Sequence, residues 1–269
     1  MREHPVKSRG DKSWDFYGSR DPYFGVLTSS IYHQANLTSE ARRDFFETGT
    51  NHMLEVVDSI KAHVDSSFEP ARGLDFGCGV GRLAIPMASL CKSIVAVDVS
   101  ESMLEEAKEN FRIQGITNAE LAVSDDHLSL IPGKFDFINS YLVFQHIPRK
   151  RGVAIFARLL SLLNDGGVGV FHFTYHRDSS SLHRLIYWVR KSLPLANRLV
   201  NLLLRRPSRQ PMMEMNEYQL NDVLRALQEA KCDLSHIDFS IHSGLYVSVL
   251  GVMIFCQKKE AKTWTSRAE

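Results

Sequence analysis

Short apolar runs alternate with longer segments of helical period between Arg72 and Thr174. This alternation is typical of repeated βα units, in which parallel strands form a sheet and helices pack against it. The apolar runs predict five strands, over 72–76, 93–98, 119–123, 135–140 and 167–175. The segments between them predict helices over 81–90, 101–114 and 148–163. Ser100 is a suitable N-cap for the second helix, and Asn164-Asp165-Gly166-Gly167 is expected to form a turn after the third. The fold class is therefore expected to be α/β, with a doubly wound, mostly parallel sheet.

The C-terminal part of the chain predicts a helix followed by a β-hairpin, in place of further βα units. Residues 217–230 are expected to form a helix, and 234–242 and 246–257 two further strands. Only Ser243-Gly244-Leu245 separates these strands, which is short enough for an antiparallel hairpin. A hairpin at the end of a parallel sheet is informative, because few doubly wound folds end in this way.

The length of 269 residues, 44% of them hydrophobic, fits one large domain that carries an insertion. We expect a helical lead-in over residues 1–65, which includes a helix over 39–64, and an α/β domain over 66–258. The insertion occupies 177–212, and the polar tail over 259–269 is expected to fray.

A glycine-rich turn follows the first predicted strand, in the run Leu74-Asp75-Phe76-Gly77-Cys78-Gly79-Val80-Gly81. Glycines at such a turn let the backbone bend sharply and approach a ligand closely. A nicotinamide-dinucleotide fingerprint would place a glycine where Arg82 stands, so this cofactor is disfavoured. Asp98 ends the second strand, where a carboxylate can accept hydrogen bonds from both ribose hydroxyls of an adenosine. Asp75 is suited to hold the cationic amino group of a methionine.

Composition excludes several other classes of protein. The formal net charge of +1 gives no overall signal for nucleic acid. The four cysteines are widely spaced, which disfavours a disulfide framework or a zinc site, and no other metal is expected. Residues 1–13 lack the apolar stretch of a signal peptide, and no window reaches about 18 consecutive apolar residues. We therefore expect a cytoplasmic protein; its oligomeric state is not predicted.

Together, the glycine turn, the two aspartates and the βα rhythm resemble the class I S-adenosylmethionine (SAM)-dependent methyltransferases over about residues 70–258. The resemblance implies a seven-stranded, Rossmann-like sheet whose last strand is antiparallel. It also implies that SAM is bound by the residues that match the first motif and the ribose-binding acid. These residues are Asp75, Gly77, Gly79, Gly81 and Asp98.

The same resemblance extends to residues around the rest of the cofactor. Val99 and Met103 match adenine-packing positions, and Ser140 matches a position near the methionine end. Asp125 is assigned to the adenine amino group, with Asp126 as its close rival. The lead-in resembles that of a bacterial subgroup in which a leading helix folds over the cofactor, so Tyr17 or Tyr23 is expected to cover SAM.

Methyl transfer is an in-line displacement, so catalysis depends on positioning, and a base is needed only when the acceptor carries a proton. In open α/β sheets the ligand lies beyond the carboxyl ends of the strands. His146 follows the fourth strand and is the predicted general base. The residues predicted to contact the acceptor are Gln145, Tyr175, His176, His242 and Tyr246.

The resemblance implies that the methyl group goes to oxygen or nitrogen of a small molecule, a sugar or a glycan. A nucleic-acid acceptor is not expected, because Asn139-Ser140-Tyr141-Leu142 lacks the two prolines that base-modifying amino-methyltransferases share. The alternative function is a non-catalytic SAM-binding scaffold that uses its basic insertion to bind an anionic partner.

The insertion holds eight Lys or Arg and one acidic residue, so its charge is +7 and the rest of the chain carries −6. Apolar residues at helical spacing predict two short amphipathic helices, which Pro194 separates. Three interpretations stay open: a surface pair with a solvated basic face, a lid over the acceptor, and helices lying on an anionic membrane.

Overall fold

The computed structural model describes residues 9–193, 195–204, 207–243 and 247–259. Within them, seven strands form one sheet in the order β3-β2-β1-β4-β5-β7-β6. The strands are β1 (Arg72–Phe76), β2 (Ser93–Asp98), β3 (Ala119–Val123), β4 (Phe135–Ser140), β5 (Leu163–Ser179), β6 (Cys232–Ser243) and β7 (Val247–Lys258). The first five pair in parallel, and β7 is antiparallel to both β5 and β6. This confirms the predicted Rossmann-like sheet and its antiparallel last strand.

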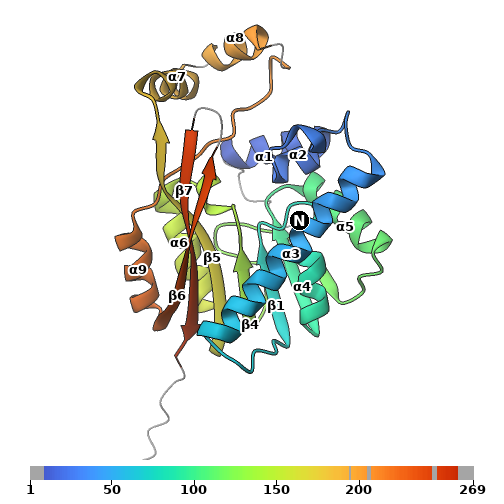
Figure 1. Ribbon diagram of the computed structural model, residues 1–269, viewed down its shortest axis with the longest axis vertical. Helices are drawn as coiled ribbons and strands as arrows, with labels where there is room; N and C mark the ends of the chain where they lie inside the picture. The colour runs from blue at the N-terminus through green and yellow to red at the C-terminus, as the bar shows by residue number, and fades with distance from the viewer. Residues whose placement is uncertain (1–8, 194, 205–206, 244–246, 260–269) are drawn as a thin grey trace, which may run out of the picture.

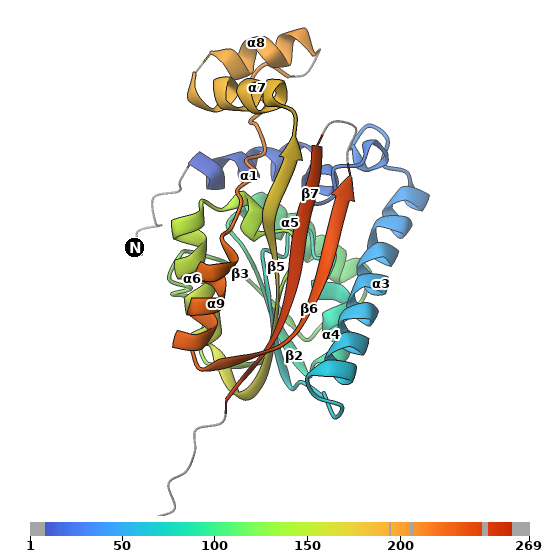
Figure 2. The same ribbon diagram turned by 60° about the vertical axis from the view of Figure 1, so that its left-hand side comes forward.

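Helices cover both faces of the sheet (Figures 1 and 2). The described helices are α1 (Arg9–Arg20), α2 (Pro22–Val26), α3 (Ser39–His63), α4 (Ala84–Leu90), α5 (Glu101–Ile113), α6 (Arg149–Ser161), α7 (Ser181–Ser192), α8 (Ala196–Leu203) and α9 (Leu220–Glu229), with short 3-10 turns at Ser30–Tyr32 and Phe144–His146. Apolar residues of α3 and α4 pack on one face of the strands, and those of α6 and α9 pack on the other. Burial on both faces explains why these strands are continuous apolar runs in the sequence.

Local sequence signals fix several helix starts. The Ser100 hydroxyl accepts a hydrogen bond from the Met103 amide, as expected of the N-cap of α5. Thr38 and Ser180 cap α3 and α7 in the same way. The two helices predicted in the insertion are α7 and α8.

Strand β5 differs from the prediction. The expected turn at 164–167 is wrong, because these residues lie within β5, where the register with β4 shifts between Phe135 and Phe137. At its other end β5 continues to Ser179, because it pairs with β7 as far as Val247. Of the predicted hairpin turn, Gly244 and Leu245 lie outside the described residues, as does Tyr246, the predicted start of the last strand. The long β5 carries α7 and α8 beyond the carboxyl edge of the parallel strands (Figures 1 and 2).

Candidate cofactor and acceptor site

The glycine-rich turn begins where β1 ends. Gly77, Gly79 and Gly81 have φ values of +78°, +53° and +90°, the left-handed region that favours glycine. The turn is pinned to the neighbouring strand, because the amides of Gly77 and Cys78 donate to the Val97 carbonyl at 2.8 and 2.9 Å. A Cβ on Gly79 would lie 2.7 Å from Cγ2 of Val26 in α2. The absence of that atom therefore lets the N-terminal segment pack directly over the turn.

Asp98 closes the turn from the end of β2. Its Oδ2 accepts a hydrogen bond from the Gly79 amide and its Oδ1 accepts one from the Ser100 amide, each at 2.9 Å. Each carboxylate oxygen keeps a further lone pair, so the group can still accept two donors from a ligand. Burial raises the pKa of Asp98 to about 6. Two hydroxyl donors would favour the ionised form and offset this cost.

Asp75 and Arg82 are buried beneath this turn, with 2% and 5% of their surface exposed. Asp75 Oδ1 accepts a hydrogen bond from Asn139 Nδ2 at 3.0 Å. Asp75 Oδ2 and Arg82 Nε have no hydrogen-bond partner among the described residues. Burial raises the pKa of Asp75 to about 6. An unpartnered carboxylate oxygen and an unpartnered guanidinium nitrogen suit a zwitterionic ligand group, such as the amino and carboxylate ends of a methionine.

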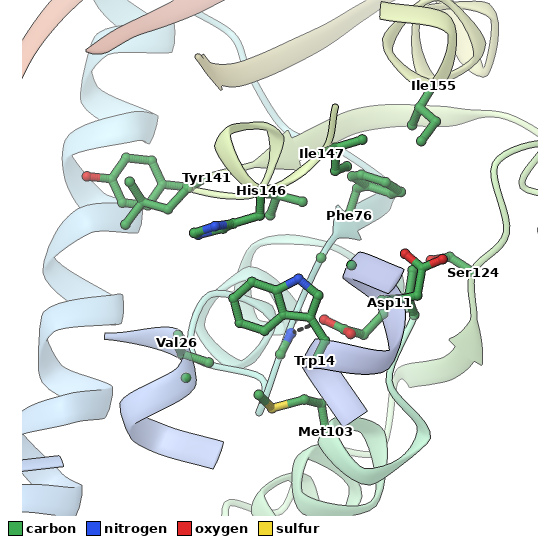
Figure 3. A pocket seen from close by; sticks show the side chains of 18 of the residues that line it. Asp11, Trp14, Val26, Phe76, Met103, Ser124, Tyr141, His146, Ile147 and Ile155 are labelled. Atoms are coloured by element: carbon green, nitrogen blue, oxygen red, sulfur yellow. Dashed lines mark hydrogen bonds between the residues drawn. The ribbon is translucent and has the colours of Figure 1, made fainter. Parts of the chain in front are cut away.

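A cavity opens above the turn. Its polar lining includes Asp98, Arg82 and the Ser124-Asp125-Asp126 segment. Its apolar walls come from several other parts of the chain, and include Trp14 of α1, Val26 of α2, Met103 of α5 and residues after β4 (Figure 3). A mostly apolar cavity with a few polar groups that converge is typical of a small-molecule site.

Comparison with known proteins agrees with this geometry. Residues 74–167 match the family model described as a methyltransferase domain. The ubiquinone biosynthesis O-methyltransferase of Thiobacillus denitrificans is 32% identical over 109 residues, which are 40% of this chain and 46% of that protein. The magnesium-protoporphyrin O-methyltransferase of Synechocystis is 31% identical over 111 residues, 40% of this chain and 48% of that protein. The matched part thus spans about half the length of these two relatives.

The fold comparison covers more of the chain. The crystal structure of magnesium protoporphyrin IX methyltransferase from Synechocystis, with bound SAM, aligns with a TM-score of 0.59 at 17% identity. It covers 96% of this chain and 100% of that one. Residues 74–167 thus match a methyltransferase domain, and the chain as a whole shares the fold of that SAM-bound enzyme. The family resemblance stated from the sequence is thereby confirmed.

Most of the predicted cofactor residues of the methyltransferase domain surround the cavity. Those that line it are Gly77, Gly79, Asp98, Val99, Met103, Asp125 and Asp126. Asp75 lies below them, and Gly81 packs toward the Phe111 ring. Ser140 is 1% exposed, lies outside the lining, and its hydroxyl donates to the Phe76 carbonyl at 3.1 Å. This bond turns the Ser140 side chain back onto β1, so its predicted contact with the methionine end of the cofactor stays a prediction.

The aromatic cover of the cavity is Trp14, where Tyr17 was expected. Tyr17 lies outside the cavity lining, and its hydroxyl donates to the Pro211 carbonyl at 2.8 Å. The Tyr23 hydroxyl is bonded to Glu106 and Asn110 of α5 at 2.6 and 3.0 Å. Trp14 is three residues before Tyr17 and therefore lies close to the same face of α1. A sequence pattern can identify this aromatic face of the helix but cannot decide which ring enters the cavity.

The two aspartates after β3 have different neighbours. Asp125 Oδ1 accepts hydrogen bonds from the His127 and Ser129 amides at 3.0 and 2.9 Å. Asp126 binds Arg151 of α6, with Nε at 2.8 Å from each carboxylate oxygen. Nη1 of Arg151 also lies 2.9 Å from Oδ1 of Asp11 in α1. The network of Asp11, Arg151 and Asp126 thus joins α1, which lies over the cavity, to the cavity wall. No sequence pattern predicted it.

His146 lies in the cavity wall after β4, with its ring edge against Trp14 and ring centroids 4.8 Å apart (Figure 3). Nδ1 lies 2.7 Å from the Glu214 carbonyl oxygen, which can only accept, so Nδ1 carries the proton. Nε2 then has the lone pair and lies 3.1 Å from Nε2 of Gln145. Burial lowers the pKa of His146 to about 4, so the ring is neutral near pH 7.

The residues predicted to contact the acceptor are not gathered around the cavity as the predicted cofactor residues are. Gln145 is 8% exposed and accepts a hydrogen bond from the Thr174 hydroxyl at 3.0 Å, which orients its amide toward His146. Tyr175, His176 and His242 lie outside the cavity lining, because β5 and β6 continue as a long antiparallel ladder with β7. Tyr246 falls outside the described residues. The role of these side chains in acceptor binding stays a prediction.

Proposed function

We propose that the protein transfers a methyl group from SAM to an oxygen atom of a small-molecule acceptor. One observation carries this proposal: His146 is a neutral histidine with its lone pair on Nε2. It lines the same cavity as the glycine turn and Asp98. The two relatives compared above are named O-methyltransferases, which supports oxygen as the acceptor atom. Nitrogen, sugar and glycan acceptors stay predictions, as does the cytoplasmic location.

The residues present fit SAM, which when bound supplies the electrophilic methyl group. Asp98 would accept the ribose hydroxyls, and the unpartnered oxygen of Asp75 would accept the amino group of the methionine part. Arg82, whose Nε also lacks a partner among the described residues, would hold the carboxylate. Val99 and Met103 would pack on the adenine, and Asp125 or Asp126 would accept its amino group.

His146 would act on the acceptor as a general base. Its Nε2 lone pair now faces the Gln145 amide, so an acceptor hydroxyl would take the place of that amide and donate its proton to Nε2. The positive charge that develops on the ring is stabilised by the Nδ1–H bond to the Glu214 carbonyl. That bond also fixes the orientation of the ring, because the Glu214 carbonyl lies in a segment that is itself held in place: the Asn216 side chain donates to the Gln145 carbonyl.

The cover formed by α1 has a second role in this chemistry. Trp14 closes the cavity next to His146 with an apolar ring (Figure 3). With acceptor and donor bound, this cover would help to exclude water from the space where they meet, which would strengthen the electrostatic interactions there and limit loss of the methyl group to water.

The proposal is tested by measuring SAM-dependent methylation of hydroxyl-bearing small molecules with wild-type protein and the His146→Ala variant. We expect the variant to lower kcat by about 100- to 10,000-fold, because a general base contributes about that much. The affinity for S-adenosylhomocysteine (SAH) should change by no more than about threefold, since the ring is not placed at the adenosine end. His63→Ala, at the C-terminal end of α3, is the matched control and should retain wild-type kcat.

Wild-type turnover in His146→Ala would refute the assignment of the base. SAH binding without transfer to any oxygen, nitrogen or sugar acceptor would contradict the enzymatic proposal and support the non-catalytic scaffold.

A further inference from the structure

The helix pair α7 and α8 stands beyond the carboxyl edge of the sheet, at the end of the long β5 (Figures 1 and 2). Each helix is amphipathic, and the apolar side of each is turned to solvent. An ordinary surface helix does the opposite, since its apolar stripe faces the core. The orientation of the helix pair therefore requires a specific explanation.

Hydrogen bonds of polar side chains join α7, α8 and the segment that follows α8, on what we call the inner side of the helix pair. Arg190 of α7 donates to the side-chain oxygen of Asn197 in α8, with Nη2 at 2.8 Å. The amide nitrogens of Asn197 and Asn201 donate to the Gln210 carbonyl at 2.9 and 2.8 Å. Asn201 is only 1% exposed. Because polar groups occupy the interior of the pair, its leucines have no interior to enter.

The outer side is strongly apolar. Of the eighteen large apolar side chains exposed in the described part of the chain, ten lie between residues 182 and 204. They are Leu182, Leu185, Ile186, Trp188, Leu193, Leu195, Leu199, Leu202, Leu203 and Leu204. Leu203 is 82% exposed and Leu202 67%. A concentration of exposed apolar side chains in one short segment is typical of an interaction site.

Two interpretations drawn from the sequence fit this arrangement poorly. A pair with a solvated basic face would turn its leucines inward, whereas here they point outward. A lid over the acceptor would direct apolar side chains into the cavity, but no residue of α7 or α8 is among those that line it. The outward leucines thus favour a partner outside the molecule.

We propose that the outer face of α7 and α8 docks on the surface of an anionic lipid bilayer. The insertion supplies charge complementarity, because it carries +7 in a chain whose remainder carries −6. Within this segment, Arg184, Arg198 and Arg209 are exposed. Trp188, 61% exposed, has the amphipathic ring that prefers the membrane interface.

The length of the helices selects a position in the plane of the bilayer. They contain 12 and 8 residues, whereas a spanning helix needs about 20. Among the described residues, no helix has the length and apolarity needed to cross a membrane. A short basic amphipathic helix instead buries its apolar face at the boundary of headgroups and acyl chains.

A second copy of the chain fits the same face less well. A twofold contact would place this helix pair against its own image, and so bring together two copies of a segment whose net charge is +7. An anionic bilayer avoids this repulsion and accepts both the leucines and the arginines.

Docking would also orient the catalytic edge. Residues that follow α8 connect the helix pair to the cavity wall, since the Glu214 carboxylate binds Lys191 of α7 at 2.9 Å while its carbonyl binds His146. The carboxyl edge of the sheet, with its cavity, would therefore lie near the lipid.

The test is sedimentation of the full chain with vesicles of phosphatidylcholine that contain about 30% phosphatidylglycerol, compared with phosphatidylcholine alone. We expect the protein to pellet with the anionic vesicles and to be released as salt is raised. The double variant Leu199→Glu/Leu203→Glu should bind at least about tenfold more weakly, because it places charges in the apolar face. Arg184→Glu/Arg198→Glu should reduce binding to anionic vesicles without removing leucines.

Leu54→Glu is the matched control, because Leu54 is a 56% exposed leucine on α3 and Leu199 is 61% exposed. It should bind vesicles like the wild type. Circular dichroism and SAH affinity at wild-type values would show that the variants are folded. The proposal is overturned if wild-type protein stays in the supernatant with both vesicle types, or if Leu199→Glu/Leu203→Glu binds as well as wild type. It is also overturned if the wild-type protein forms a dimer or captures a protein partner but does not bind vesicles, and Leu199→Glu/Leu203→Glu abolishes that dimer or capture.

Discussion

At the scale of single residues, the site depends on two carboxylates: Asp75 is buried, and Asp98 is half-buried in the cavity wall. Asp75 and Asp98 both have a pKa raised to about 6 by burial. Each is therefore held, near pH 7, in an ionised state that the empty protein disfavours and a cationic or hydroxyl-bearing ligand would favour. The ligand-free site is organised at a cost in stability.

The affinity for SAH should depend on pH through these two groups. The ionised carboxylates are the acceptors, and in the empty protein they become protonated as pH falls through about 6. Affinity should therefore fall between pH 8 and pH 5, by about tenfold for each carboxylate that binds the ligand. Calorimetric titration across this range checks the prediction. An affinity that stays constant or rises on acidification would contradict it.

The Asp75→Asn variant separates stability from binding. Because the pKa of Asp75 is raised in the folded protein, its stabilising contribution is fully present below its unfolded pKa and is lost as pH rises through about 6. At pH 8 the neutral amide avoids this penalty, so the ligand-free variant should be more stable by up to about 3 kcal/mol. Its affinity for SAH should decrease. Thermal unfolding at pH 8 measures the first effect, and a lower Tm would argue against it.

The sequence predicted these residues because their signals are local. Asp75, Gly77 and Gly79 lie in one turn, and Asp98 ends a short apolar run. Arg82 was used only to exclude a nicotinamide cofactor, although its place directly after the glycines was a signal of its own. Trp14 could not be selected, because its place in the cavity depends on how α1 crosses residues about 130 positions later, such as His146.

At the scale of elements, α1 is the part of the molecule that closes the cavity. Arg151 joins it to the body through Asp11, at 2.9 Å, and through Asp126, at 2.6 Å. The side chains of Asp11 and Arg151 are 12% and 22% exposed, so their interaction is screened less than a surface ion pair. The geometry makes α1 a cover whose closure depends on this network.

Removal of one charge should loosen that cover. Asp11→Asn is expected to speed SAH dissociation by about tenfold, since a hydrogen bond to a charged group contributes about 1.5–3 kcal/mol. The rate of SAH dissociation is measured by stopped-flow tryptophan fluorescence, which reports on Trp14, after the SAH complex is mixed with an excess of a competing ligand. Glu109→Gln, in the exposed pair with Arg112 on α5, is the control and should leave the rate unchanged. Equal rates for wild type and Asp11→Asn would show that the network does not hold the cover.

Element boundaries were predictable where burial is continuous. The first four strands match their predicted spans, because each is an apolar run covered by helices on both faces. The extension of β5 to Ser179 was not predictable, since Arg177, Asp178 and Ser179 are polar and become a strand only by pairing with residues 247–249. Long-range pairing of this kind leaves no local pattern.

At the scale of the whole molecule, α7 and α8 lie at the same end of the sheet as α1 (Figure 2), and α1 contributes Trp14 to the cavity lining. The sequence revealed the unequal charge of the insertion but left three interpretations open. The orientation of the two helices distinguishes them, because periodicity shows that a helix is amphipathic and only the tertiary structure shows which side faces out.

The central claim is that the glycine turn and Asp98 bind SAM. The most direct test is calorimetric titration of SAH into wild-type protein and into Asp98→Ala at pH 8. We predict one site per wild-type chain and an affinity at least about 100-fold lower in the variant, because two charge-assisted hydrogen bonds to the ribose are lost. Undiminished SAH binding by a folded Asp98→Ala variant, or no binding by the wild type, would contradict the account.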